Sequence, residues 1–285
     1  IAETDGEVVQ NSTSYCLRND GARLLSEVIR VRGRLADLQV FEETRGLRVG
    51  DAVEFQQEML SAELGPGLLG QIFDGLQNPL PRVAEETGYF LTPGIYLDGT
   101  PTVSEGDTMA AGMTLGTVPE NMFDHAVMTP FDLPGPATVQ SIAEKGSYTV
   151  NDEIATLQDE EGNEHKVTMR QDWPVRRALS VRRRRLMPAD PLITGVRIID
   201  SVFPVAAGGT YCIPGPFGAG KTVLQQITSR HAQVDVVVLV LCGERASEAV
   251  EALREFPKLE DPRTGRSLME RTVIICNTSA MPVAA

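Results

Sequence analysis

The sequence predicts two β-rich modules followed by an α/β segment with a parallel sheet. Three observations predict this fold class. Short runs of β-branched and apolar residues alternate with glycines over residues 1–67, a hairpin pattern recurs within residues 90–172, and strand-length apolar runs alternate with helical patterns from residue 173 onward. At roughly 100 to 200 residues per domain, a chain of 285 residues has room for two or three domains.

Composition and charge exclude several classes of function. The chain holds 39 acidic and 26 basic side chains, and its net charge of −13 argues against a general nucleic-acid binder. It contains no signal peptide and no run of about 18 to 20 apolar residues, so we predict that it does not itself cross a membrane. Four scattered cysteines favour a reducing, cytosolic compartment over a zinc site or disulfides, and apolar neighbours predict buried thiols at Cys212, Cys242 and Cys276.

The charge is divided unevenly along the chain. Residues 1–165 hold 28 acidic and 9 basic side chains, whereas residues 166–285 hold 11 acidic and 17 basic ones. We therefore expect an anionic ligand to bind in the C-terminal part. Much of the basic surplus lies in Arg176, Arg177 and the run Arg182 to Arg185, a pattern more typical of a solvated connector or subunit contact than of a nuclear address or nucleic-acid patch.

The first module, residues 1–67, is predicted to be a small β-barrel. Strand-like runs cover residues 24–31 and 35–41, a glycine separates them, and a further run covers residues 52–55. Residues 68–89 then form a connecting helix and linker in this prediction, because apolar residues between 68 and 76 recur at helical spacing.

The second module, residues 90–172, contains two similar phrases about forty residues apart. Val103-Ser-Glu-Gly-Asp107 begins the first, and Lys145-Gly-Ser-Tyr-Thr-Val-Asn-Asp152 begins the second. The layout resembles the barrel-sandwich fold of biotinyl and lipoyl carrier domains, in which two such halves face each other. Those carriers present a modifiable lysine, and the corresponding residues 124–131 contain none. We therefore interpret the module as a β-rich structural insert.

The third segment, residues 173–285, alternates strands and helices as expected for a parallel sheet covered by helices. The unbroken apolar run at residues 236–241 predicts a strand buried on both faces. Val223 and Ile227 are expected on the core side of one helix, and Val250 and Leu253 on that of the next. The predicted elements are strand 210–213, helix 222–230, strand 236–241, helix 247–256 and strand 273–276.

The strongest chemical signal is a glycine-rich motif between a predicted strand and a predicted helix. Its residues match G-x-x-x-x-G-K-[ST] at every specified position: Gly215, Pro216, Phe217, Gly218, Ala219, Gly220, Lys221 and Thr222. The glycines let backbone N–H groups converge on phosphate oxygens, and the following helix directs its positive end at the same anion. Lys221 can then reach the β- and γ-phosphates while the Thr222 hydroxyl ligates Mg²⁺. The alternative is a glycine-rich turn with an exposed lysine.

A second signal, Cys242-Gly-Glu-Arg245, follows the apolar run directly. A carboxylate at the carboxyl end of a parallel strand points into the crevice where open α/β sheets bind ligands, so Glu244 is placed to orient and deprotonate a water. Arg245 could steady that carboxylate or contact phosphate or a neighbouring subunit. The alternative for Glu244 is an acid that interacts with a helix dipole. An aspartate at the end of a second strand, which P-loop NTPases use for magnesium, is not found.

These motifs together give a family resemblance. The P-loop, the Gly-Glu-Arg triplet, Asp261-Pro-Arg-Thr-Gly265, Asn277-Thr-Ser-Ala-Met-Pro282 and Trp173-Pro-Val175 resemble the catalytic A subunit (alpha chain) of V-type ATPases, in particular the prokaryotic A/V-type enzymes. The resemblance covers nearly the whole chain. Phe217 in the P-loop and the β-rich insert, the family's bulge or non-homologous region, separate it from the F-type β subunit.

The resemblance implies a fold, a site and partners. The fold would be a RecA-like P-loop NTPase domain, present in part, preceded by the β-barrel and the barrel-sandwich-like bulge. It assigns phosphate binding to Gly215 through Thr222, Mg²⁺ to Thr222, catalysis to Lys221 and Glu244, and support to Arg245. ATP/ADP and Mg²⁺ would be the ligands, and a B subunit in an alternating A3B3 ring, central stalk subunits and, indirectly, a membrane ion-translocating sector would be the partners.

The sequence thus predicts a cytoplasmic, membrane-peripheral catalytic subunit that couples ATP hydrolysis or synthesis to proton or sodium transport. The start at Ile1 and the missing aspartate strand suggest a truncated fragment, with little or no activity alone. The alternative is a stand-alone P-loop ATPase, such as a secretion or termination ATPase, which would share the nucleotide core and lack the insert. A carrier or purely structural module would bind no nucleotide.

Overall fold

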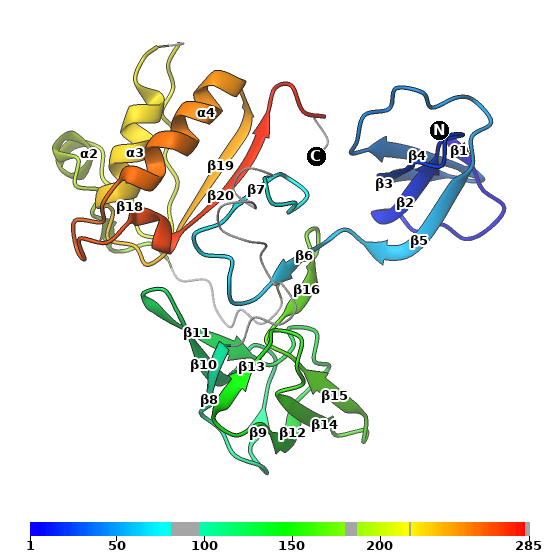
Figure 1. Cartoon of the computed structure of the whole chain (residues 1–285), viewed down its shortest axis with the longest axis horizontal. Helices are drawn as coiled ribbons and strands as arrows, with labels where there is room; N and C mark the ends of the chain where they lie inside the picture. The colour runs from blue at the N-terminus through cyan, green and yellow to red at the C-terminus, as the bar shows by residue number, and fades with distance from the viewer. Residues whose placement is uncertain (81–96, 180–186, 217, 283–285) are drawn as a thin grey trace.

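The computed structural model describes residues 1–80, 97–179, 187–216 and 218–282, arranged as three lobes (Figure 1). An N-terminal sheet, a β-rich insert and an α/β segment each form one lobe. Strands β6 (Ser61–Leu64) and β16 (Gln171–Pro174) pair antiparallel where the lobes meet. The predicted arginine run at 182–185 and Phe217 lie outside the described residues, as do residues 81–89 of the predicted linker.

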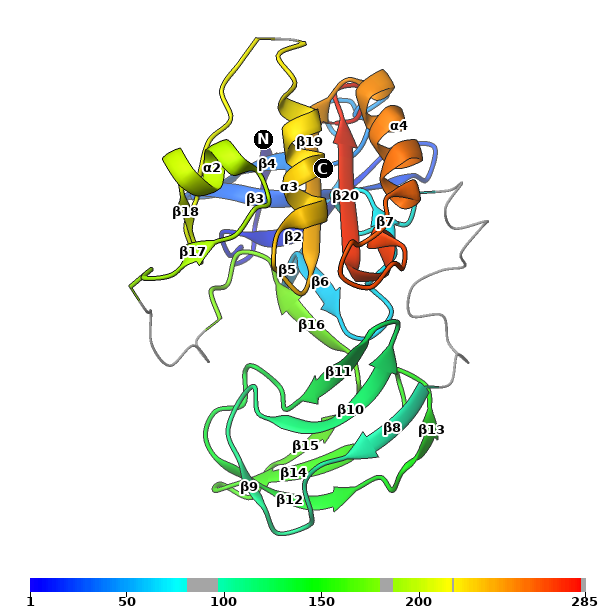
Figure 2. The ribbon, with the colours of Figure 1, turned by 90° about the vertical axis from the view of Figure 1, so that its left-hand side faces the viewer.

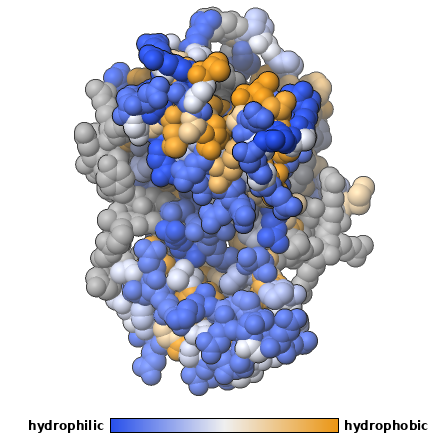
Figure 3. Space-filling view, turned by 90° about the vertical axis from the view of Figure 1, so that its right-hand side faces the viewer, coloured by the Kyte–Doolittle hydropathy of each residue, from blue (hydrophilic) through white to orange (hydrophobic). Residues whose placement is uncertain are grey.

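The N-terminal lobe is a five-stranded antiparallel sheet with the order β1-β4-β3-β2-β5. Its strands are β1 (Ala2–Glu3), β2 (Ser12–Leu17), β3 (Arg23–Arg32), β4 (Leu35–Val40) and β5 (Val53–Met59). The predicted strands at 24–31, 35–41 and 52–55 are confirmed. Hydroxyl groups take part in its interior, since Ser14 and Ser26 are fully buried and hydrogen-bond to each other at 2.8 Å. Apolar side chains remain visible on the outer side of this lobe (Figure 3).

The predicted helix at 68–76 is wrong. Gly67 and Gly70 have φ values of +101° and +85°, which break a helical path, and the chain instead forms turns and the short strand β7 (Ile72–Phe73). Both β7 residues are buried because Ile72 and Phe73 pair in parallel with strand β20 (Thr272–Thr278) of the α/β segment. Tertiary pairing therefore overrides a local helical spacing.

The insert consists of two four-stranded antiparallel sheets related by an internal two-fold pattern. The sheet orders are β11-β10-β8-β13 and β15-β14-β12-β9, so each half of the module donates one strand to the sheet of the other half. The strands are β8 (Leu97–Pro101), β9 (Thr108–Met109), β10 (Thr114–Glu120), β11 (Phe123–Met128), β12 (Ala137–Ile142), β13 (Gly146–Tyr148), β14 (Ala155–Asp159) and β15 (Glu164–Val167). The predicted repeat is real at the level of topology.

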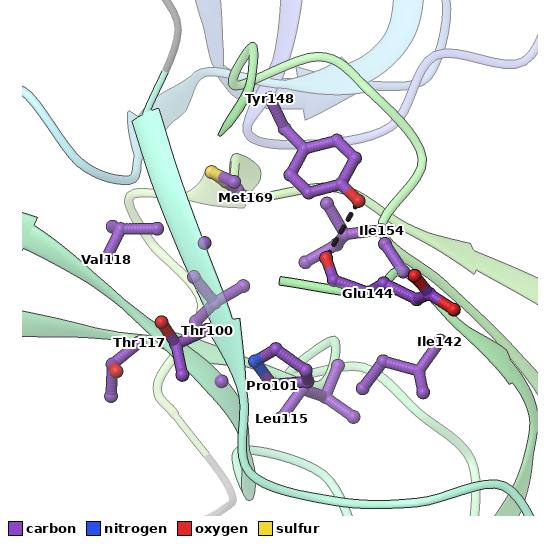
Figure 4. Close-up of a pocket in the computed structure, with 14 residues that line it drawn as sticks. Thr100, Pro101, Leu115, Thr117, Val118, Ile142, Glu144, Tyr148, Ile154 and Met169 are labelled. Atoms are coloured by element: carbon purple, nitrogen blue, oxygen red, sulfur yellow. Dashed lines mark hydrogen bonds between the residues drawn. The ribbon is translucent and has the colours of Figure 1, made fainter. Parts of the chain in front are cut away.

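The two sequence phrases form equivalent turns. The Asp107 carboxylate accepts a hydrogen bond from the Ser104 amide at 2.8 Å, and the Asp152 carboxylate accepts one from the Thr149 amide at 2.7 Å. Between the sheets, an apolar core excludes solvent from Leu115 and Leu157. A cavity of about 30 Å³ remains there, with Leu115 and other apolar side chains around it and the Tyr148 hydroxyl donating to a backbone carbonyl at its side (Figure 4).

The α/β segment contains a three-stranded parallel sheet with the order β19-β20-β7. Helices α3 and α4 lie on the same side of this sheet (Figures 1 and 2). The buried face of the sheet packs against Ala249 and Phe256. The elements are β17 (Pro191–Leu192), α2 (Arg197–Val202), β18 (Val205–Ala206), α3 (Lys221–His231), β19 (Val237–Glu244), α4 (Ala246–Glu255), the 3-10 turns η1 (Phe256–Lys258) and η2 (Leu268–Arg271), and β20.

Four expectations about burial or strands in this segment are wrong. Residues 210–213 form no strand. Strand β19 is buried on one face only, because α4 covers Leu239 while Val238 and Val240 are 59% and 53% exposed on the other face. Val223 and Ile227 are exposed on α3, and Val250 is exposed on α4 although Leu253 packs on the core. The thiols of Cys212 and Cys242 are exposed, whereas that of Cys276 is buried.

Candidate P-loop site

The glycine-rich motif lies directly before helix α3, in the context that the sequence predicts. Gly220 is the N-cap of α3 with φ +81°, and Gly218 has φ +76°, a region that L side chains rarely adopt. Gly220 has no side chain with which to cap this helix end. The first N–H groups of a helix have no intrahelical acceptor, so they remain available to an anion in front of Lys221.

The start of the loop is tightly packed. A Cβ at Gly215 would lie 2.9 Å from Cβ of Ala219, so a side chain there would force the loop open. The Lys221 ammonium folds back and donates to the carbonyls of Gly215 at 2.9 Å and Pro216 at 3.0 Å. These two hydrogen bonds hold the Lys221 ammonium over the glycine-rich loop. Phosphate oxygens can replace the two carbonyls as its acceptors.

Glu244 ends strand β19, as predicted. Gly243 before it has φ +69°, and the pairing with β20 shifts register between Cys242 and Glu244. A bulge of this kind redirects the following side chain. The Glu244 carbonyl accepts from the Ser279 amide at 2.8 Å, which fixes this end of the strand to the chain after β20. Arg245 then leads into α4, where its carbonyl accepts from the Ala249 amide at 2.9 Å.

The structure brings these predicted residues together. A hollow of about 1000 Å³ is lined by Gly218 to Thr222 from the loop and by Gly243, Glu244 and Arg245 from the end of β19. In Figure 2 the N-terminal end of α3 and the carboxyl end of the parallel strands point to the same edge of the segment. This is the edge at which open α/β sheets bind ligands. The hollow has room for a nucleotide.

Several lining residues were not predicted. Gln225 and Gln226 follow Lys221 and Thr222 by one helical turn, so the helical period could have identified them. Cys212 lines the same hollow three residues before the loop, and Glu251 reaches it from α4. No sequence pattern marks Glu251, because its contribution depends on how α4 packs.

The residues present fit a phosphate group and, in part, a magnesium ion. Positive-φ glycines, uncapped helix N–H groups and a lysine form a cradle suited to an anion. Thr222 supplies a hydroxyl in the first turn of α3 within the hollow, a ligand type that Mg²⁺ accepts. Within the described ranges, no group of three or more His, Cys, Asp and Glu side chains could hold a metal ion on its own.

The part of the chain that the structure describes contains no helix long and apolar enough to cross a membrane.

Comparison with known proteins yields three family matches in succession. Residues 7–56 match the β-barrel domain of the ATP synthase alpha/beta family, residues 96–176 match the ATP synthase alpha/beta subunit barrel-sandwich domain, and residues 195–285 match the nucleotide-binding domain of the ATP synthase alpha/beta family. Each match falls on one of the three lobes.

Individual relatives agree. The chain is 56% identical over 290 residues to the V-type ATP synthase alpha chain of Treponema denticola. It is 57% identical over 290 residues to V-type ATP synthase alpha chain 1 of Treponema pallidum. Each comparison covers 99% of this chain and 49% of the relative. The chain is 51% identical over 292 residues to the V-type ATP synthase alpha chain of Borrelia hermsii, covering 50% of that protein. The chain spans about half the length of these curated relatives. With three consecutive matches to its domains, the chain belongs to the ATP synthase alpha/beta family.

Proposed function

We propose that this chain is part of the catalytic, nucleotide-binding subunit of a rotary ion-translocating ATPase or ATP synthase. The observation that carries the proposal is the shared hollow, in which the P-loop residues Gly218 to Thr222 face the Glu244 end of a parallel strand. The similarity to V-type ATP synthase alpha chains supports it. The domain limits of the sequence analysis, residues 1–67, 68–89, 90–172 and 173–285, remain part of this proposal.

The chemistry would be phosphoryl transfer from ATP to water. The loop amides and Lys221 would hold the phosphates, and Glu244 would orient the attacking water and accept its proton. The Thr222 hydroxyl would hold Mg²⁺, which neutralises phosphate charge when bound with the nucleotide. Arg245 would support Glu244 or contact phosphate. Charge that develops in the transition state is thereby stabilised by preorganised donors.

The proposed setting includes partner subunits. B subunits alternating with this subunit in an A3B3 ring, central stalk subunits and a membrane ion-translocating sector would couple the reaction to proton or sodium transport. The protein would lie at the cytoplasmic face of the membrane and bind no nucleic acid. In a pull-down, recovery of a B-type partner supports this setting, whereas a stand-alone P-loop ATPase would recover none.

The P-loop assignment is tested by titrating the chain with a fluorescent Mg·ATP analogue. Lys221→Ala removes charge-assisted hydrogen bonds to phosphate, so we expect roughly 10- to 100-fold weaker binding. Lys258→Ala removes the same charge from an exposed lysine that pairs with Glu255, and it should bind like the parent. Equal affinity of all three proteins would remove Lys221 from the site.

The catalytic assignment is tested in the full-length protein assembled with its partners. Glu244→Gln keeps the size of the side chain and removes the base, so the ATPase rate should fall by about 10²- to 10⁴-fold. Glu255→Gln is the control, since that exposed carboxylate lies at the other end of α4. Undiminished turnover of Glu244→Gln contradicts its role.

A further inference from the structure

Arg271 is a fully buried charge outside the P-loop hollow. It ends η2 directly before strand β20, and its guanidinium is 0% exposed. Its Nε atom lies 2.8 Å from Oδ2 of Asp261, which is also fully buried. Burying such a pair is costly unless further polar contacts compensate for lost water, so the other guanidinium contacts need an explanation.

Those contacts go to the last turn of α3 and to the connection between α3 and β19. Arg271 donates from Nη1 to the carbonyl of Val234 at 3.0 Å and from Nη2 toward the carbonyls of Ser229 at 3.4 Å and Arg230 at 3.5 Å. Helix α3 ends at His231, and the last carbonyls of a helix have no intrahelical donor. A cation there is also favoured by the helix dipole. One guanidinium thus holds the end of α3 and the chain entering β19.

Apolar packing does little to hold α3 in the described segment. None of its side chains is buried, and Val223 and Ile227 are 59% and 39% exposed. A second polar contact acts at the same end, because Nε of Arg230 donates to the carbonyl of Glu260 at 3.0 Å, next to Asp261. Asp261 is itself fixed by Arg263, which donates from its amide at 2.9 Å and from its guanidinium. The C-terminal end of α3 is therefore held by polar contacts centred on the buried pair of Arg271 and Asp261.

The opposite ends of both elements reach the P-loop hollow. Helix α3 has 11 residues, so at about 1.5 Å per residue Lys221 lies about 12 to 14 Å along the helix from the clamped carbonyls of Ser229 and Arg230. Strand β19 runs from the same end to Glu244. A small rotation of α3 at Arg271 would become a larger displacement at Lys221 relative to Glu244.

We propose that Arg271 is a positioning residue that sets the placement of the P-loop helix relative to Glu244, and this inference rests on the proposed function. The P-loop binds phosphates before and during the reaction, whereas Glu244 acts only when water attacks. An altered spacing therefore lowers kcat more than it raises KM. A displacement of about 1 Å at a reacting group can reduce the rate on the order of 10²-fold.

The test measures steady-state ATPase activity of the assembled full-length protein carrying Arg271→Met, Arg271→Lys or Arg266→Met. Arg271→Met should lower kcat by roughly 10- to 100-fold with KM changed less than about 3-fold, and Arg271→Lys should recover part of the loss. Arg266→Met is the matched control, since Arg266 is half exposed, pairs with Glu270 and should leave kcat unchanged. If Arg271→Met does not fold, Asp261→Asn/Arg271→Met removes both buried charges and takes its place.

A double-mutant cycle with Glu244→Gln separates positioning from general weakening. If Arg271 acts through the placement of Glu244, Arg271→Met should lower kcat little further once Glu244 is Gln. Full additivity, or an unchanged kcat in the folded Arg271 variants, overturns the inference. The proposed function fails separately, through Lys221→Ala or Glu244→Gln with undiminished binding or turnover.

Discussion

The β-rich insert and the α/β segment use aliphatic residues and glycines in different ways. In the insert, two sheets enclose Val118, Val139 and Leu157, each at most 1% exposed. In the α/β segment, α3 buries no side chain and half of β19 faces outward. The comparison shows that the insert is stabilised by its own core, whereas the P-loop is presented by elements held through polar contacts and one face of a sheet.

Glycine shows the same contrast. Gly116 in the insert lets two strands approach closely, since a Cβ there would lie 2.7 Å from the carbonyl oxygen of Thr100. Gly218 and Gly220 in the P-loop meet no atom within 4 Å of an added Cβ, and their role is a positive φ that turns N–H groups outward. Gly116 serves packing, whereas Gly218 and Gly220 give the loop the backbone conformation that the proposed phosphate binding needs.

The largest expected effects on stability come from the removal of a buried leucine, and the core of the insert gives the first case. Leu157→Ala leaves a cavity between the two sheets and should lower the free energy of unfolding by about 2 to 5 kcal/mol. Fluorescence of the single tryptophan in urea measures this, because Trp173 packs edge-on against Phe131 of the insert at 5.6 Å. If Leu157→Ala lowered the free energy of unfolding by less than a surface substitution does, the insert would not have a closed core.

The next largest effect on stability is expected at Gly116, where two strand backbones approach closely. Gly116→Ala places a Cβ against the Thr100 carbonyl, and we expect a loss of about 1 to 3 kcal/mol because neither strand can shift freely. The affinity of Gly116→Ala for nucleotide should not change.

Gly218→Ala should instead weaken nucleotide binding, because alanine is strained at the positive φ of this position. Its loss of stability should be about 1 kcal/mol. If the two variants lost the same stability and the same affinity for nucleotide, the contrast between the two glycines would be wrong.

A smaller effect is expected on the exposed face of β19. Val240→Ala should cost less than about 1 kcal/mol because half of the side chain is already in water, whereas Leu239→Ala on the buried face of the same strand should cost about 2 to 5 kcal/mol. Urea unfolding of the two variants followed by circular dichroism compares them. Equal losses would show that the outer face is covered in solution.

The smallest effect concerns pH. Hydrogen bonds from His165 and Asn163 lower the pKa of Asp159 to about 2, from 3.8. As the pH falls, the Asp159 carboxyl of the unfolded chain binds a proton before that of the folded protein does. The stabilisation of the folded state by Asp159 is therefore present above pH 3.8 and is lost as the pH falls toward 2. The difference in Tm between the parent and Asp159→Asn should shrink between pH 5 and pH 2. A constant difference contradicts the assigned role of Asp159.

The polar contacts at the lobe junction were not predictable. Gly67 and Leu69 donate their amides to the Glu120 carboxylate at 2.6 and 3.2 Å, and His125 hydrogen-bonds to its other oxygen at 2.6 Å. Burial raises the pKa of Glu120, but these hydrogen bonds outweigh it and the pKa lies below its usual value. Gly67 and Leu69 lie more than fifty positions from Glu120 in the sequence, and no local pattern connects them to it.

By itself, the sequence determined the local features of this protein: most strands, the repeat of the insert, the helices around the P-loop and the identity of the loop. These depend on spacing and on glycine at positive φ, which are properties of neighbouring residues. Tertiary structure decided that Ile72 and Phe73 join the distant strand β20, that residues 210–213 form no strand, and that one face of β19 stays exposed. It also placed Arg271 at the end of α3. These outcomes depend on which distant segments supply hydrogen bonds and cover apolar surface, and local patterns do not contain that information.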